Sequence, residues 1–414
     1  MAENTKPRFF HGYIIVAATF FITMITYGTM YTFGVFFEPL LAEFGWTRAM
    51  TSGAYSLFMV FSGLLYIVTG RLNDRFGPRI VVTVCGFFLG LGYLLMSQIS
   101  AVWHLYLFYG VIISIGVSGA FVPLISTVAR WFVKKRGLMT GIVEAGTGIG
   151  TVIMPPVANW LIFNYGWRTS YIIVGIIVLL PIVLAAQFLK RHPEQIELLP
   201  YGADEATGEN LNLQARGFSL QQAVHTRQFW LLCGIYFSFL FCVQTIMVHA
   251  VIYATGLGIS PTSAASILVI IGGLSIAGRV MIGSAGDRIG NKPALTISLA
   301  LMSLTLFGLV ATKGIWALYL FAAIFGFIYG GLVVLISPLV AELFGLRSHG
   351  VILGIVAFCS GIGGAIGPVM AGHIFDITGS YQLAFLVCGA IGFVSSILTL
   401  LLRPANRKGL IQNI

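Results

Sequence analysis

One arginine lies inside an apolar stretch of the chain, where a charged side chain is costly. Arg279 stands in the run GGLSIAGRVMIG, eight positions before Asp287, which is a rise of roughly 12 Å along a helix. An unpaired guanidinium at the middle of a membrane helix costs at least about 2.5 kcal/mol. We therefore expect Arg279 to face a watery cavity and to bind an anion. The alternative is a structural pairing with a protein carboxylate.

The guanidinium group of Arg279 also limits the kind of anion. Its planar fork suits a carboxylate, and it stays charged at any physiological pH. A single arginine neutralises one carboxylate, whereas a dicarboxylate usually needs two positive partners. The sequence therefore favours a small monocarboxylate, such as lactate or pyruvate, as the bound anion.

Two titratable side chains in other apolar stretches could carry a proton, with His249 as the first candidate and Glu144 as the second. His249 could donate a hydrogen bond to a hydroxyl or carbonyl of the bound molecule, or carry the proton itself. Glu144 is the one carboxylate well inside an apolar stretch. The alternatives are a packing role for His249 and, for Glu144, an ion pair with a nearby arginine such as Arg130.

Aromatic residues could complete a binding pocket. Tyr27 and Tyr31 are one helical turn apart and project from one face, and Tyr329 stands in the other half of the chain. Phenols can donate to a carboxylate and give an apolar wall to a methyl group. Phe358 and Cys359 interrupt a glycine-rich stretch and could close the pocket around a short carbon chain. The alternative for each is helix packing.

These residues are positioned by a chain that is too apolar for a soluble protein. Of its 414 residues, 58% are apolar and 9% are charged, which leaves too little polar surface to cover a globule in water.

The five cysteines lie in apolar stretches without CxxC spacing, so we expect neither disulfides nor a metal site. The glycine patterns at 146–150 and 361–367 lie in apolar runs without a phosphate-binding motif, so we expect no nucleotide, no cofactor and no enzyme.

Twelve apolar runs are close to the roughly 20 residues that a helix needs to cross a bilayer. A polar stretch at 190–226 divides them into two groups of six, and we expect it to be a cytoplasmic linker between a bundle at 1–189 and a bundle at 227–414. The predicted fold is an all-α membrane protein of twelve transmembrane helices. The runs are 11–36, 50–70, 78–99, 104–131, 137–162, 169–189, 227–254, 263–284, 293–311, 316–341, 350–375 and 381–402.

Basic residues indicate the orientation of these helices. If both termini lie in the cytoplasm, only Arg48, Arg168 and Lys313 fall outside and Arg279 falls within a span, so 19 of the 23 Lys and Arg residues (23 − 4) lie inside. Topology and an anionic inner leaflet therefore account for the net charge of +10, which removes the case for a nucleic-acid partner. We expect a multi-pass protein of the cell membrane with no obligatory protein partner.

The two halves repeat each other at a fixed offset. Gly70, Asp74, Arg75 and Gly77 recur as Gly283, Asp287, Arg288 and Gly290, an offset of 213 residues (283 − 70). At the same offset, Gly137, Gly141, Gly148, Gly150 and Pro155 recur as Gly350, Gly354, Gly361, Gly363 and Pro368. A repeat in the same orientation implies a pseudo-two-fold axis along the membrane normal, with a substrate site between the halves.

The repeated glycine, Asp-Arg pair and glycine resemble the signature of the major facilitator superfamily between its second and third helices. This resemblance implies two six-helix bundles that rock to give alternating access. It also implies that Asp74, Arg75, Asp287 and Arg288 belong to a charge cluster that closes the cytoplasmic side. The alternative for these four residues is a helix cap with ordinary positive-inside topology.

A second resemblance begins at Trp131. The runs WFVKKRGLMTGIVEAGTGIG and HGYIIV are similar to motifs of the monocarboxylate transporter family, with the oxalate–formate exchangers as near relatives. The family places its substrate-binding arginine in helix 8, which matches Arg279. Vertebrate-type members of the family also carry a lysine in helix 1 and an aspartate four residues before the helix 8 arginine, where this sequence has Tyr31 and Ser275.

The sequence is therefore compatible with three functions. The resemblance implies proton-coupled symport of a monocarboxylate, and the two departures put the proton relay in question. An anion exchanger of the oxalate–formate type and a membrane sensor on the same fold are the alternatives.

Overall fold

The computed structural model describes residues 10–203, 217–312 and 314–403. The expected cytoplasmic charges Lys6, Arg8, Arg216, Arg407 and Lys408, the expected external Lys313 and the acidic linker residues Asp204, Glu205 and Glu209 lie outside these ranges. Within them the chain is helical, with one isolated bridge between Phe132 and Tyr201.

The first half contains the spans before the linker. Its segments are α1 (Gly12–Met30), α2 (Phe33–Phe44), α3 (Arg48–Phe76), α4 (Pro78–Met96), α5 (Val102–Leu105), the π-helical η1 (Tyr106–Ile113), α6 (Ser114–Ser118), α7 (Val122–Trp131) and α8 (Arg136–Ala186). The segments α1 and α2 together form the first span, and α5 to α7 form the fourth.

The second half follows a linker that carries two short helices, η2 (Pro193–Ile196) and α10 (Leu220–Val224). Its spans are α11 (Arg227–Gly256), α12 (Pro261–Ile289), α13 (Asn291–Leu309), α14 (Ile315–Phe344), α15 (His349–Thr378) and α16 (Gln382–Leu400).

The described residues contain eleven helical segments long and apolar enough to cross a membrane. One of them, α8, is 51 residues long and covers the expected fifth and sixth spans. Gly166 lies between these spans with φ 76° and ψ 160°, a conformation that a side chain would strongly disfavour. The helical segments before and after Gly166 follow each other directly. The break between spans expected at 163–168 is therefore a kink within one helix and not a loop.

Buried apolar side chains form two clusters. One is drawn from residues 15–189, and the other comes from residues 218–402 together with Val122 and Ile125. Two long contacts join the halves: α8 packs along α12, and α3 packs along α15.

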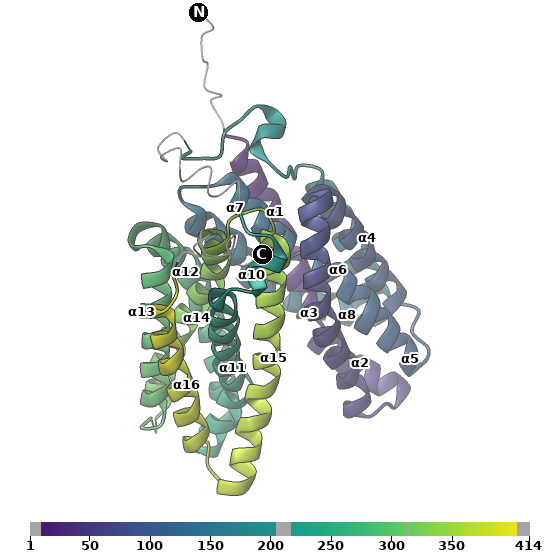
Figure 1. Cartoon of the computed structure of the whole chain (residues 1–414). Coiled ribbons are helices and arrows are strands. Elements are labelled where there is room, and N and C mark those ends of the chain that lie inside the picture. Colours follow the sequence, from purple (N-terminus) through teal and green to yellow (C-terminus); the bar gives the residue numbers. More distant parts are fainter. Residues whose placement is uncertain (1–9, 204–216, 313, 404–414) are drawn as a thin grey trace, which may run out of the picture.

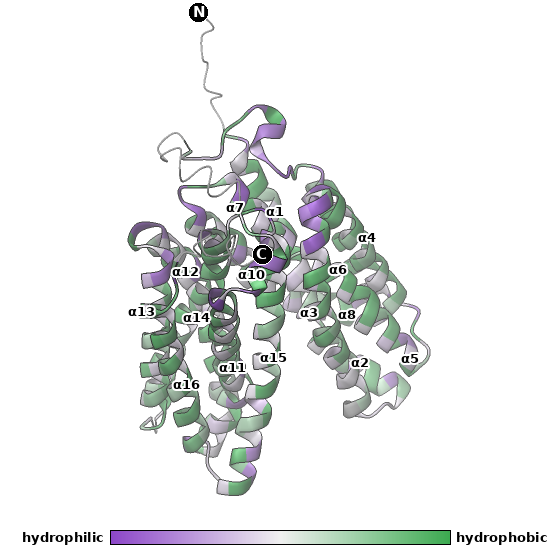
Figure 2. Cartoon of the chain, viewed as in Figure 1, coloured by the Kyte–Doolittle hydropathy of each residue, from purple (hydrophilic) through white to green (hydrophobic). Residues whose placement is uncertain are grey.

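The linker defines one end of the molecule, which we call the linker end. Trp131 Nε1 donates to the carbonyl of Lys190 at 2.8 Å, and the Phe218 amide donates to the carbonyl of Phe344 at 2.8 Å, so the described parts of the linker contact both halves. Hydrophilic residues concentrate at this end, while apolar residues cover the helices below it (Figure 2). The helices α3 and α15 approach each other near the linker end and diverge toward the opposite end (Figure 1).

Candidate functional site

Arg279 reaches from the second half to the first. Its side chain lies on α12, is 4% exposed, and donates from Nη1 to the backbone carbonyl of Glu144 on α8 at 2.9 Å. The Glu144 side chain is itself buried and interacts electrostatically with Arg279. Within the described residues, Arg279 Nε and Glu144 Oε1 have no hydrogen-bond partner, so both groups retain bonding capacity. Arg279 therefore joins the two halves through a hydrogen bond to the Glu144 backbone, with the Glu144 carboxylate in electrostatic range of the guanidinium.

Glycines on α8 make this contact possible. A Cβ atom at Gly141 would meet the backbone carbonyl of Arg279, and one at Gly148 would lie 3.1 Å from Arg279 Nη1. The glycine pattern in this part of the sequence therefore serves close packing of α8 on α12.

The alternative interpretation of Glu144, an ion pair with Arg130, differs from the arrangement in the structure. Arg130 Nη2 instead lies 2.5 Å from Asp74 Oδ1, at the linker end. Glu144 is the carboxylate in electrostatic range of Arg279, so it is the candidate that the structural interpretation of Arg279 would need.

Several tyrosines lie within electrostatic range of Arg279 or Glu144. Tyr31 lies at the break between α1 and α2, is 48% exposed, and interacts electrostatically with Tyr329 of α14 and with Arg279. One turn earlier, Tyr27 shares a hydrogen bond with Tyr66 of α3, and both phenols are in electrostatic range of Glu144. The structure thus brings Tyr27, Tyr31, Tyr329 and Arg279 together.

A cavity of about 230 Å³ lies between the halves beside these tyrosines. Its lining residues come from α1, α3, the turn before α7, α11, α14 and α15, so both halves contribute to its wall. The lining residues are Tyr27, Met59, Ser62, Gly63, Tyr66, Phe121, Tyr236, Phe239, Leu240, Val333, Ile336, Ala357, Ser360 and Gly361.

Phe358 and Cys359 are neighbours of this lining. Phe358 faces Gly63 of α3, across the contact between the halves. The thiol of Cys359 shares a hydrogen bond with that of Cys233 on α11, within the second half. Phe358 is thus placed to limit the cavity, whereas Cys359 serves a helix contact.

His249 occupies a different place. Its Nδ1 is 3.1 Å from the Tyr381 hydroxyl, and its Nε2 is 2.9 Å from the Pro368 carbonyl. Both partners belong to the second half, and the imidazole is 8% exposed. These contacts match the packing interpretation of His249, and they do not join it to Arg279.

Two aspartates connect the halves at the linker end. Asp74 Oδ1 and Oδ2 accept hydrogen bonds from the amides of Gly350 and Val351 at 3.1 and 3.0 Å. Asp287 Oδ1 and Oδ2 accept from the amides of Gly137 and Leu138, both at 2.7 Å. We call these two contacts the linker-end gate. Each aspartate thus caps the first turn of a helix in the other half, where backbone amides lack partners of their own helix.

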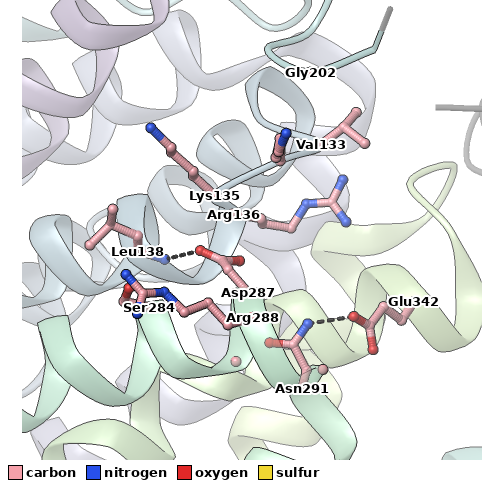
Figure 3. A pocket seen from close by; sticks show the side chains of 13 residues that line it. Val133, Lys135, Arg136, Leu138, Gly202, Ser284, Asp287, Arg288, Asn291 and Glu342 are labelled. Atoms are coloured by element: carbon pink, nitrogen blue, oxygen red, sulfur yellow. Dashed lines mark hydrogen bonds between the residues drawn. The ribbon is translucent and has the colours of Figure 1, made fainter. Parts of the chain in front are cut away.

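The two arginines predicted for the same cluster behave differently. Arg75 stacks on the Phe76 ring of its own helix, with its guanidinium carbon 5.1 Å from the ring centroid. Arg288 faces a cavity of about 660 Å³ beside Asp287, where Asn291 also donates to Glu342 (Figure 3).

A histidine in the linker contributes no charge to this end at neutral pH. Burial, together with the positive charges of Arg130 and Arg191, lowers the pKa of His192 to about 4. The positive charge beside Asp74 therefore comes from arginines.

Several residues of the candidate site were missed by sequence reasoning. Tyr66, Tyr55, Tyr236 and Phe239 stand in apolar runs whose periodicity does not show which face meets the other half. The sequence contains no signal for them, because the packing of α3 on α15 that puts Tyr66 in the cavity is visible only in the tertiary structure.

Comparison with known proteins gives a family and relatives. The profile of the Major Facilitator Superfamily matches residues 19–295 and, separately, 232–413. Monocarboxylate transporter 13 of Rattus norvegicus is 29% identical over 383 residues, covering 92% of this chain and 86% of the relative. Monocarboxylate transporter 12 of Mus musculus is 28% identical over 425 residues, covering 96% and 86%. Monocarboxylate transporter 4 of Rattus norvegicus is 28% identical over 406 residues, covering 94% and 82%.

Solved structures support the same fold. The proton:xylose symporter XylE, bound to 6-bromo-6-deoxy-D-glucose, aligns with a TM-score of 0.74 at 17% identity, over 94% of this chain and 95% of that one. The human organic anion transporter MFSD10 (TETRAN) aligns with a TM-score of 0.74 at 16% identity, over 95% and 100%. The predicted all-helical fold of two six-helix bundles is confirmed by these comparisons.

Proposed function

This chain belongs to the Major Facilitator Superfamily, and from that premise we propose that it is a secondary active transporter that moves a monocarboxylate of the lactate or pyruvate type together with a proton. It is related to proteins named monocarboxylate transporters over more than nine tenths of its length, which implies a transporter rather than an enzyme. The expected partners are the monocarboxylate anion, the proton and the lipid bilayer.

The observation that carries the proposal is the position of Arg279 between the halves. Its guanidinium contacts α8 of the first half, retains an Nε–H without a partner in the described residues, and is in electrostatic range of the exposed Tyr31, which is itself in range of Tyr329. A carboxylate that binds this guanidinium would contact both halves at once. Such a ligand can favour rocking between two states, as alternating access requires.

Glu144 is the proton carrier in this proposal, in preference to His249. In the empty site, Arg279 and an ionised Glu144 sum to no net charge. A bound substrate carboxylate would leave the site with one unbalanced negative charge, which is costly in a buried position. Protonation of Glu144 removes that charge. One proton therefore enters with one anion, and transport is electroneutral.

In this proposal, each end of the molecule faces a defined side of the membrane. With the linker end in the cytoplasm of the cell, as the basic residues suggest, the linker-end gate closes the cytoplasmic side and the exposed Tyr31 faces outward. The structure then corresponds to an outward-facing state. The bundles at 1–189 and 227–414 would rock about this gate, with 190–226 as the connecting segment.

The test is a counterflow and uptake panel in proteoliposomes with the internal pH recorded in the same vesicles. Lactate and pyruvate should be taken up and should acidify the interior, and an inward proton gradient should drive their accumulation whereas a membrane potential alone should not. Exchange of labelled for unlabelled anion without any pH change would support an exchanger instead. Binding without transport would support a sensor.

A further inference from the structure

The cavity of about 230 Å³ between the halves, which Tyr27 and Tyr66 help to line, has few groups free to bind a polar molecule. Its serines donate into their own helices: Ser62 to the Met59 carbonyl at 3.1 Å and Ser360 to the Ala357 carbonyl at 2.7 Å. The Tyr236 hydroxyl donates to the Leu332 carbonyl at 3.3 Å.

The remaining phenols of the lining are engaged with each other, since Tyr27 and Tyr66 share a hydrogen bond. One of these two phenols donates to the other, so a single phenol hydrogen of the wall is left over. A molecule with several hydroxyls or charges in this cavity would lose its hydration and find only that one hydroxyl donor, which is unfavourable.

The rest of the wall is apolar and comes from both halves. Met59 and Phe121 belong to the first half, and Phe239, Leu240, Val333 and Ile336 belong to the second. The Phe239 ring also stacks on Tyr329, with ring centroids 6.3 Å apart, which fixes one wall next to the Arg279 site. An apolar group in the cavity would therefore be enclosed by both halves.

The size of the cavity exceeds what the smallest acids need. A water molecule occupies about 30 Å³ of liquid, so the cavity has the room of roughly seven to eight waters. The methyl group of lactate or pyruvate would leave most of this space without contacts, and unfilled apolar space forfeits dispersion energy.

We propose that the substrate of this transporter is a monocarboxylate whose tail is apolar and branched or aromatic, with the carboxylate on Arg279 and the tail in the cavity. This inference rests on the proposed function and names the substrate class for the same site. The cavity and Arg279 are linked through Tyr27, which lines the cavity and is in electrostatic range of Glu144, the residue that contacts Arg279.

The experiment compares keto acids that share one head group and differ only in the tail. Pyruvate carries a methyl group, α-ketoisocaproate an isobutyl group, phenylpyruvate a benzyl group, and α-ketoglutarate a second carboxylate. In proteoliposomes we expect kcat/KM for α-ketoisocaproate to exceed that for pyruvate by at least about tenfold, because buried methylene groups add to binding. We expect α-ketoglutarate not to be transported. Because these keto acids are almost fully ionised at neutral pH, leakage through the lipid is small, and it can be measured in protein-free vesicles.

A cavity-filling variant tests the location of the tail. Gly361 lines the cavity, and a Cβ atom built there meets nothing within 4 Å, so Gly361→Leu directs a new side chain into open space. This variant should lower the preference for α-ketoisocaproate over pyruvate at least about tenfold, with Gly361→Ala in between. Gly234→Leu is the matched control: Gly234 also stands in a helix with nothing within 4 Å, outside the cavity lining, and should keep the wild-type preference.

The outcomes separate this inference from the proposed function. Transport in which pyruvate matches or exceeds α-ketoisocaproate would overturn the inference and leave the monocarboxylate transporter intact. An equal loss of preference in Gly361→Leu and Gly234→Leu would place the tail elsewhere and also overturn it. Failure of the folded protein to transport any of the monocarboxylates would overturn the proposed function itself.

Discussion

Asp287 Oδ1 accepts a hydrogen bond from the backbone amide of Gly137 at 2.7 Å, across the contact between the two halves. The repeat-related pair, Asp74 and Gly350, makes the same bond at 3.1 Å. Gly137 and Gly350 each lie in the first turn of a long helix, α8 and α15, whose positive end favours a carboxylate. The signature aspartate of each half thus acts as a helix cap for the other half, so the gating and capping interpretations describe one contact.

Neutralising the two aspartates of the linker-end gate should lower the stability of the folded protein by unequal amounts. Asp287→Asn weakens two charge-assisted hydrogen bonds, which we expect to cost about 1–3 kcal/mol. Asp74→Asn does the same and also leaves Arg130, whose side chain is 1% exposed, without its ion pair, which adds roughly 3–5 kcal/mol. Thermal unfolding in detergent should therefore show a larger decrease in Tm for Asp74→Asn. The exposed Asp376→Asn serves as a control with no expected change. Equal decreases for the two gate variants would argue against the Arg130 contribution.

Gly283→Ala should loosen the linker end. A Cβ atom at Gly283 would collide with the backbone carbonyl of Gly137, so the methyl group forces α12 away from α8. We expect faster hydrogen–deuterium exchange in residues 137–140 and a shift toward the state that opens at the linker end. Gly273→Ala, on the same helix with nothing within 4 Å of the new atom, should leave exchange unchanged. Unaltered exchange in Gly283→Ala would contradict close packing at this point.

Arg279→Lys should fold and reach the membrane yet lose most uptake. A lysine keeps the positive charge but replaces a bidentate fork with a point charge, so it cannot hold the Glu144 carbonyl and a carboxylate in the same geometry. Uptake in proteoliposomes measures the loss, and Arg168→Lys, at an exposed ion pair with Glu43, is the matched control. Normal uptake by Arg279→Lys would remove this residue from the substrate site.

Glu144→Gln should uncouple substrate transport from the proton gradient. The amide cannot take up a proton, so exchange of labelled for unlabelled substrate should continue while gradient-driven accumulation is lost. Substrate accumulation under an inward proton gradient is the measurement, with exchange measured in parallel.

His249→Gln is the comparison for the same test. It removes hydrogen bonds to Tyr381 and Pro368 within one half, so it should lower stability and keep coupling. If His249→Gln loses coupling and Glu144→Gln keeps it, the carrier assignment is reversed. Full accumulation in both variants would leave the proton on the substrate or in water.

The sequence by itself determined the class of fold. Length and apolar content require membrane spans, because each backbone polar group in lipid must be bonded within a helix. The repeat of Asp74 and Arg75 as Asp287 and Arg288 indicated two related bundles, since equal spacing over an offset of 213 residues (287 − 74) reflects equal position in each half. Arg279 was identified as a candidate because a lone charge in an apolar run needs a partner.

Only the tertiary structure decided which partner each charge has. A helix shows its periodicity in sequence, but in a membrane protein both the lipid-facing and the buried faces are apolar, so the pattern does not reveal which face meets another helix. For that reason the sequence allowed an ion pair between Glu144 and Arg130. In the structure, close packing of α8 on α12 puts Glu144 beside Arg279, and Arg130 pairs with Asp74. The same limit hid Tyr66, whose position in the cavity depends on α3 meeting α15 across the contact between the halves.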